Sequence, residues 1–367
     1  MPVFLLIAFV IYFLFGVAIG MIIAYPLASA ITICAILIVA FIHDIKRSSS
    51  GVDLHFFYKP DVNVENWKRL QNDSVGLMDF FEEAIGSYPW SQYSIIQGGD
   101  GGMEYAMCTF IDGVGHPTMR SLYSVTSHEI AHTWFQFLMA TNESKHSWMD
   151  EGFTSYIDDV AMNVILNEGK ALPNANAYKD YFRWVATGLE EPMTTHADRF
   201  KFNTGYGMSA YDKGSIFLSQ LQYIIGKENF DNTLKKYFND WSFRHPKPND
   251  FIRSAEKVSG LELDWYLLDW AQSTMTIDYS INSVYGVNNR TKIVLKRIGQ
   301  MGMPIDIRVL LDSGDSLNFN IPMTKMRGSK PLENSTLLES WSWAKPYYEF
   351  RIDVDSNKIS KILIDPK

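Results

Sequence analysis

The first 42 residues form an almost unbroken apolar run that contains no Asp, Glu, Lys or Arg. The run is interrupted only near Tyr25-Pro26, which leaves two stretches, residues 3–24 and 27–42, of about the length that crosses a bilayer. This pattern predicts a membrane hairpin of two transmembrane helices over residues 1–42, in contact with lipid. Residues 43–50, which bring the first charges, would then be a linker.

Helical spacing dominates the next part of the chain, residues 51–275. A short strand is predicted at its start, over residues 51–57. Beyond it, apolar residues recur at intervals of three and four, as they do on the buried face of a helix. The segments predicted as helices are 65–86, 121–139, 151–166, 176–189, 209–226, 228–241 and 263–272.

The period of the apolar pattern changes to two after Thr276. Apolar residues alternate with polar ones from Ile305 to Val309, and again from Leu317 to Ile321 beyond a turn at residues 312–315. Similar alternation returns near the end of the chain. The pattern predicts a small β-sandwich over residues 276–367.

Composition restricts the class of function without deciding it. The chain is 47% hydrophobic and 20% charged, with a formal net charge of −8. These values are typical of a globular enzyme, and the acidic balance without a basic stripe argues against a nucleic-acid partner.

A cluster of potential metal ligands lies within the second predicted helix. His128 and His132 are four residues apart, so both can point an imidazole at one metal ion while Glu129 lies beside them. Glu151 follows after 18 intervening residues, and a helix capped by Asp150 would carry it in its first turn. Two histidines and a carboxylate, with a fourth position open to water, predict a catalytic zinc site. The alternative is an amphipathic helix whose histidines only make hydrogen bonds.

Two further motifs flank this cluster in the chain. Gly101-Gly102-Met103-Glu104 lies upstream, and Tyr211-Asp212-Lys213-Gly214 lies downstream. The order and spacing of the three motifs resemble the aminopeptidase N family of gluzincin zinc metallopeptidases over about residues 51–275. The resemblance implies an α+β fold with a thermolysin-like, mainly helical catalytic domain.

The resemblance also implies a function, a membrane-anchored zinc aminopeptidase with one zinc ion per chain and peptide substrates. A base beside the metal, Glu129, would take the proton of a zinc-bound water and pass it to the leaving amine. By resemblance, Tyr211 would stabilise the oxyanion and Glu104 would hold the substrate's ammonium group. Gly101, Gly102 and Met103 would belong to a strand that pairs with the extended peptide.

One residue is a candidate for supporting the metal ligands. Asp158 follows Glu151 by seven residues, two turns along the same helix face, so it could orient a ligand histidine through the second ring nitrogen. A solvated surface carboxylate is the alternative.

Other functions remain open because relatives in this family usually carry a β-domain before the catalytic domain, and none is recognisable here. Its lack would loosen selectivity for a free amino terminus, which would favour an endopeptidase or another zinc hydrolase. A catalytically impaired, membrane-bound peptide-binding protein is a further alternative. The apolar run predicts a multi-pass membrane protein. The resemblance favours an extracytoplasmic catalytic domain, whereas Lys46 and Arg47 favour the cytoplasmic side.

Overall fold

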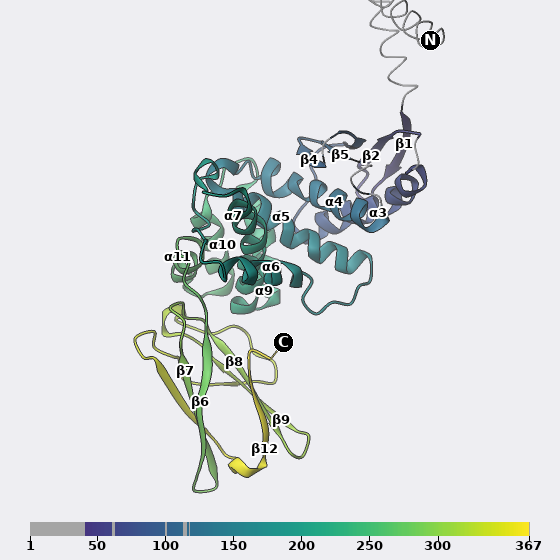
Figure 1. Ribbon diagram of the computed structural model, residues 1–367. Helices are drawn as coiled ribbons and strands as arrows, with labels where there is room; N and C mark the ends of the chain where they lie inside the picture. Colours follow the sequence, from purple (N-terminus) through teal and green to yellow (C-terminus); the bar gives the residue numbers. More distant parts are fainter. Residues whose placement is uncertain (1–40, 61–62, 100, 113–115, 117, 367) are drawn as a thin grey trace, which may run out of the picture. The chain divides into compact units, whose positions relative to one another are not determined.

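The computed structural model describes residues 41–60, 63–99, 101–112, 116 and 118–366 (Figure 1). The chain divides into two compact units. The first unit takes in the chain up to Gly76 and residues 90–126, and the second takes in residues 77–89 and 127–367.

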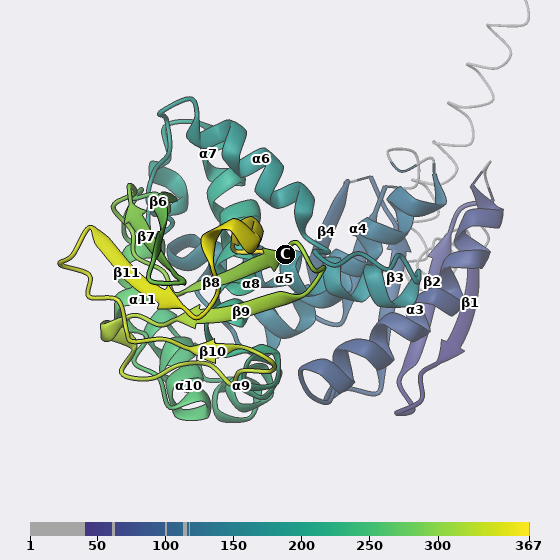
Figure 2. The same ribbon diagram turned by 90° about the horizontal axis from the view of Figure 1, so that it is seen from below.

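The first unit contains a mixed five-stranded sheet with the order β1-β2-β3-β5-β4. An antiparallel pair lies at each end, β1 with β2 and β4 with β5, and the central contacts of β3 are parallel. Figure 2 shows β1 at one edge of this sheet, beside β2. Alternate residues of β2 and β3 are buried, which gives the sheet one apolar face. The strands are β1 (Ile42–Arg47), β2 (Asp53–Tyr58), β3 (Gln92–Gln97), β4 (Gly102–Tyr105) and β5 (Cys108–Ile111).

Two helices continue from this unit into the second one. Helix α3 (Val64–Ala84) follows β2, and the parallel pairing of β2 with β3 requires such a crossover. Helix α4 (Met119–His132) follows β5, and its last turns belong to the second unit.

Strand β1 corrects the prediction for the start of the described chain. Residues expected to end a membrane span and form a linker are instead extended and pair with β2, from Ile42 opposite Tyr58 to Arg47 opposite Asp53. The last pair is also joined by an ion pair of 2.7 Å between Arg47 and Asp53. The hydrogen-bonded sheet therefore begins within residues 42–47, before the boundary predicted at residue 51.

Within the described ranges, no helix has both the length and the apolar character needed to span a bilayer. That finding contradicts the predicted fold class with two transmembrane helices, as well as the predicted multi-pass membrane location. The predicted spans covered residues 3–24 and 27–42, and all of these residues except 41 and 42 lie outside the described residues.

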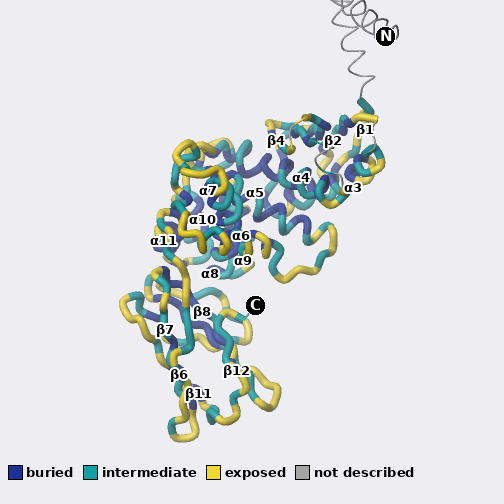
Figure 3. The backbone as a smooth tube through the Cα atoms, in the orientation of Figure 1, coloured by how far each residue is buried: buried dark blue, intermediate teal, exposed yellow. Residues whose placement is uncertain are grey.

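Helices make up the first part of the second unit, where buried residues are concentrated around α5 (Figure 3). The largest fully buried side chains here are aromatic, among them Trp134, Trp148 and Phe153. The helices are α5 (Glu143–Ile165), α6 (Ala175–Val185), α7 (Asn203–Gly207), α8 (Gly214–Ile225), α9 (Lys227–Trp241), α10 (Pro248–Ser259) and α11 (Asp264–Ala271). Wider π-helical turns, η1 (Thr133–Leu138) and η3 (Met208–Lys213), continue α4 and precede α8, and a short 3₁₀ turn, η2 (Ala197–Arg199), precedes α7.

Two β-sheets follow and enclose a separate apolar core. One sheet has the order β11-β7-β6 and the other β10-β9-β8-β12. Ile293, Ile307 and Phe350 are among the buried residues between them. The strands are β6 (Tyr279–Val287), β7 (Arg290–Arg297), β8 (Ile305–Leu311), β9 (Ser316–Ile321), β10 (Thr336–Leu337), β11 (Tyr347–Ile352) and β12 (Ile359–Ile364), with 3₁₀ turns η4 (Thr324–Met326) and η5 (Ser356–Lys358).

Helices α5 and α8 pack against each other at two glycines. A Cβ atom built on Gly152 would lie 2.5 Å from the Cα of Gly214 and 2.8 Å from the carbonyl oxygen of Ala210. A Cβ atom on Gly214 would lie 2.7 Å from the Cα of Gly152. These neighbours are backbone atoms, which cannot rotate away, so the two helices approach only because both positions lack a side chain.

We expect Gly152→Ala to lower the free energy of unfolding by about 1–3 kcal/mol, because the added methyl group forces α5 and α8 apart. Urea denaturation followed by circular dichroism measures this change. Gly207→Ala is the matched control, since its methyl group meets nothing within 4 Å and alanine favours a helix. Equal stability of the two variants would contradict the close packing.

Candidate metal centre and active site

Two imidazoles meet at the end of α4. His128 and His132 are one helical turn apart, and their Nε2 atoms lie 3.1 Å from each other. The ring planes are nearly perpendicular, at 81°. His132 is almost completely buried, with 1% of its surface exposed. The helix period therefore produces the convergence that the sequence predicted for this pair.

Helix α5 adds a carboxylate to the same point. Glu151 Oε2 lies 3.3 Å from His128 Nε2 and 3.2 Å from His132 Nε2. Ligand atoms bonded at about 2.0–2.1 Å to a tetrahedral zinc ion lie about 3.3–3.4 Å from one another. Two nitrogens and one oxygen with these separations therefore fit one zinc ion.

The start of α5 differs from the prediction. The helix begins at Glu143, and its N-cap is Asn142, whose side chain accepts a hydrogen bond from Lys145 N at 3.1 Å. The backbone is kinked at His146, where φ is −134° and ψ is 45°. Asp150, expected as the cap, instead lies inside the helix, and the prediction of its capping role is wrong.

Asp150 contacts the metal-site histidine from behind. Its Oδ1 atom lies 2.7 Å from His132 Nδ1, and Thr154 Oγ1 lies 3.3 Å from the same nitrogen. This contact leaves His132 Nε2 free to face a metal ion. The sequence suggested that Asp158 orients a ligand histidine. In the structure, the carboxylate that contacts the second ring nitrogen of His132 is that of Asp150. Asp158 is buried further along α5.

Burial and mutual contacts shift the pKa values of His132 and Glu151 in opposite directions. Burial lowers the pKa of His132, but the hydrogen bonds to Asp150 and Glu151 outweigh burial and raise it well above the usual value. Burial acts to raise the pKa of Glu151, yet its contacts with both histidines hold that pKa below the usual range. Glu151 is therefore an anion that faces two nitrogen donors.

Tyr211 on η3 extends over this cluster. Its hydroxyl donates a hydrogen bond of 2.6 Å to Glu151 Oε1, and its ring stacks on His128 with centroids 5.9 Å apart. Burial, followed by the negative charge of Glu151, raises the pKa of the phenol. Tyr211 is therefore a hydrogen-bond donor at neutral pH.

A buried ion pair holds the end of the same turn. Lys213 Nζ lies 2.6 Å from Glu190 Oε1 and donates to Ser273 O at 3.1 Å. Tyr181 donates to the same oxygen of Glu190 at 2.8 Å. The sequence analysis includes Lys213 only as part of a motif and does not include Glu190. The separation of these two residues along the chain matches no motif or helical repeat that would indicate a contact.

The remaining predicted site residues lie on α4 and at β4. Glu129 is buried on α4 next to His128. Glu104 is also buried, but it lies on β4 in the first unit, opposite Thr109 of β5. Gly102 and Met103 belong to the same strand, and Gly101 immediately precedes it. The parts assigned to these residues in catalysis and substrate binding stay predictions.

Comparison with known proteins points to one family. The Peptidase family M1 domain matches residues 71–270. Aminopeptidase B of Homo sapiens is 29% identical over 211 residues, which are 51% of this chain and 32% of that protein. Leucine aminopeptidase 2 of Neurospora crassa is 25% identical over 232 residues, or 57% of this chain and 34% of that protein. The chain thus spans about a third of the length of these relatives.

A solved structure agrees at the level of the fold. The crystal structure of Legionella pneumophila aminopeptidase A in complex with aspartic acid is similar to this chain with a TM-score of 0.61 and 16% identity. The similarity covers 86% of this chain and 36% of that one. It therefore extends beyond the segment that the family match covers.

Proposed function

Because the chain belongs to peptidase family M1, a family of metallopeptidases, we propose that it is a zinc aminopeptidase that hydrolyses the first peptide bond of peptides. The family membership confirms the resemblance seen in the sequence motifs. The observation that carries the proposal is the convergence of His128, His132 and Glu151 within 3.3 Å of one another beneath the Tyr211 hydroxyl.

Zinc held by His128, His132 and Glu151 would supply a Lewis acid that polarises the scissile carbonyl and lowers the pKa of water. Glu129 takes a proton from the attacking water and delivers it to the leaving amine. Asp150 keeps His132 in the tautomer that presents Nε2 to the metal.

Tyr211 stabilises the negative charge that develops on the carbonyl oxygen of the substrate. Its phenol is protonated and half-buried, and its only task in the reaction is to donate a hydrogen bond to the oxyanion. The buried Lys213–Glu190 pair fixes the end of η3 two residues away, so the ring of Tyr211 has a defined position. Such preorganisation reduces the cost of reorienting the donor during the reaction.

Substrate selection is assigned to β4. It is the last strand in the described sheet, so an extended peptide can pair with its free edge. Glu104 on this strand binds the substrate's ammonium group, which limits cleavage to the first peptide bond. Gly101 and Gly102 allow the peptide backbone to approach closely.

Removal of a metal ligand tests the zinc site. We expect His132→Ala to lose its stoichiometric zinc, because two remaining ligands hold the ion weakly. Elemental analysis after dialysis measures the metal content. His196→Ala is the control, since His196 lies in the second unit on a surface turn and should leave zinc unchanged. Retention of one zinc per chain by His132→Ala contradicts the assignment of the site.

Comparison of free and N-acetylated peptides tests the aminopeptidase activity. We expect the chain to prefer free amino termini by about tenfold to a hundredfold in kcat/KM, equivalent to about 1.4–2.7 kcal/mol, the range of a charge-assisted hydrogen bond. Glu104→Ala should erase this ratio.

Glu65→Ala provides the matched control for the loss of a carboxylate. Glu65 is in the first unit, and its side chain is 82% exposed, so the preference should be unchanged. Cleavage of the acetylated peptide as efficiently as the free one by the unmodified chain would replace the aminopeptidase proposal with an endopeptidase.

A further inference from the structure

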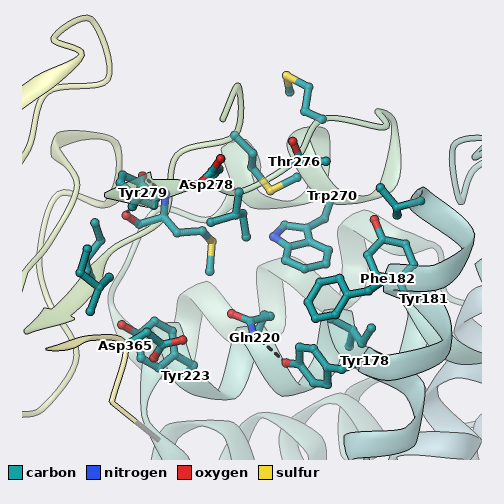
Figure 4. A pocket seen from close by; sticks show the side chains of 18 of the residues that line it. Tyr178, Tyr181, Phe182, Gln220, Tyr223, Trp270, Thr276, Asp278, Tyr279 and Asp365 are labelled. Carbon is teal, nitrogen blue, oxygen red and sulfur yellow. Dashed lines mark hydrogen bonds between the residues drawn. The ribbon is translucent and has the colours of Figure 1, made fainter. Parts of the chain in front are cut away.

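A cavity of about 420 Å³ lies within the second unit, and the lining residues do not include His128, His132 or Glu151 (Figure 4). Helices α6, α8 and α11 line one side of it. The start of β6, the approach to β8 and the end of β12 line the other. The volume is in the range of small-molecule sites in proteins.

The wall of the cavity is aromatic and contains one unsatisfied donor. Trp270 is 5% exposed, and its indole nitrogen is buried without a hydrogen-bond acceptor among the described residues. Figure 4 shows this indole facing the cavity, with the nitrogen on the side towards Tyr279. A buried N–H without an acceptor costs about 1–3 kcal/mol, so an occupant with an acceptor oxygen is favoured here.

The tyrosine hydroxyls of the wall are satisfied within the protein. Tyr279 donates to Met303 O and accepts from Met303 N. Tyr223 donates to Pro304 O and accepts from Asp306 N. Tyr178 accepts from Gln220 at 2.7 Å (Figure 4). The indole of Trp270 therefore differs from these groups in that it needs a partner from outside the protein.

The charge of the lining is negative. Asp278 and Asp365 both line the cavity and are exposed to solvent, and no Lys, Arg or His is among the described residues that line it. Lys330 lies over the Tyr223 ring, but it pairs with Asp306 at 2.7 Å, which offsets its charge. The aromatic rings add negative faces that attract cations.

We propose that this cavity binds a small amphiphilic cation. The ligand has an apolar or aromatic body within the aromatic wall, a carbonyl-type oxygen that accepts from Trp270 Nε1, and an amine that faces Asp278 and Asp365. This site is separate from the one that holds the metal, and the proposal does not depend on the peptidase activity.

Two benzamides of equal size test the proposal. N-[2-(dimethylamino)ethyl]benzamide carries a cationic amine, and N-(3-methylbutyl)benzamide replaces that amine with carbon. The full chain labelled with 5-fluorotryptophan is titrated with each probe and observed by fluorine NMR. Trp270→Phe identifies the Trp270 resonance among the ten tryptophans.

The cationic benzamide should shift the Trp270 resonance and bind about three- to fivefold more tightly than the neutral one, the effect of partly exposed ion pairs. Trp270→Phe should weaken both probes by about threefold to tenfold through the lost hydrogen bond. The double variant Asp278→Asn/Asp365→Asn should bind both probes equally. Asp264→Asn, an exposed carboxylate on α11 outside the cavity lining, should keep the preference.

Either of two results overturns the proposal. Equal binding of both benzamides by the unmodified chain excludes the cationic class of ligand. A Trp270 resonance that neither probe shifts at millimolar concentration excludes the site. The double Asp variant changes only surface carboxylates, so the test of charge stands even if Trp270→Phe fails to fold.

Discussion

Glu129→Gln should keep its zinc and lose about 10²–10⁴-fold in kcat, the usual contribution of a general base. The amide has nearly the shape of the carboxylate but cannot take a proton from water. Glu129 is buried on α4 directly after His128, so the substitution leaves the metal ligands in place. Elemental analysis and hydrolysis of an aminoacyl reporter substrate, performed on the same sample, separate metal binding from chemistry.

Glu228→Gln is the matched control, because Glu228 is exposed in the first turn of α9. It should have the turnover of the unmodified chain. A Glu129→Gln chain with full zinc content and unchanged kcat removes Glu129 from the mechanism and leaves the zinc assignment standing.

Tyr211→Phe should reduce kcat by about 10²–10³-fold, the cost of removing one donor to an oxyanion, with a much smaller effect on KM. The same hydroxyl also donates to Glu151 Oε1 at 2.6 Å, so zinc content must be measured beside the kinetics. Loss of turnover with zinc retained assigns the hydroxyl to the transition state. Loss of both would assign it to support of the metal ligand.

Tyr285→Phe controls for the removal of a phenol elsewhere in the second unit, since Tyr285 is 44% exposed on β6. It should leave both measurements unchanged. A Tyr211→Phe chain with near-normal kcat would show that the oxyanion needs no donor from η3.

The approach of the two histidines could be predicted from the sequence because it is local. His128 and His132 lie on one turn of one helix, so the period of the helix alone brings them together. Glu151 required knowledge of how α5 lies beside α4, and its prediction depended on the length of the gap between the motifs. Asp150 was misassigned because an aspartate before a helical pattern resembles a cap, and only the tertiary structure reveals its contact with His132.

Two secondary-structure elements, β1 and α10, were not predicted from the sequence. Strand β1 follows directly on an apolar run, so its short alternation was counted as part of a membrane span and a linker. Helix α10 was missed, although Pro248 at its first turn, Asp250 bonded to Lys247 N and a left-handed Gly260 mark its two ends. A weak pattern does not explain the omission, since the buried residues Phe251, Ile252 and Ala255 recur at helical spacing.

Buried long-range pairs are beyond any reading of local patterns. The contact of Gly152 with Gly214 and the ion pair of Lys213 with Glu190 each join residues far apart in the chain. The residue type does not predict either contact, because glycine is most often found in turns and charged residues on surfaces. The fold of the helices had to be known before either contact could be identified.

The Lys213–Glu190 ion pair limits which amino-acid substitutions the protein tolerates at these two positions. Its side chains are 1% and 8% exposed, and loss of one partner leaves a buried charge at a cost of about 3–5 kcal/mol. That cost is a large part of the roughly 5–15 kcal/mol that stabilises a protein. Replacement of either residue alone leaves an unpaired buried charge and destabilises the fold. Replacement of both residues by apolar ones leaves no buried charge. We therefore expect positions 190 and 213 to change together.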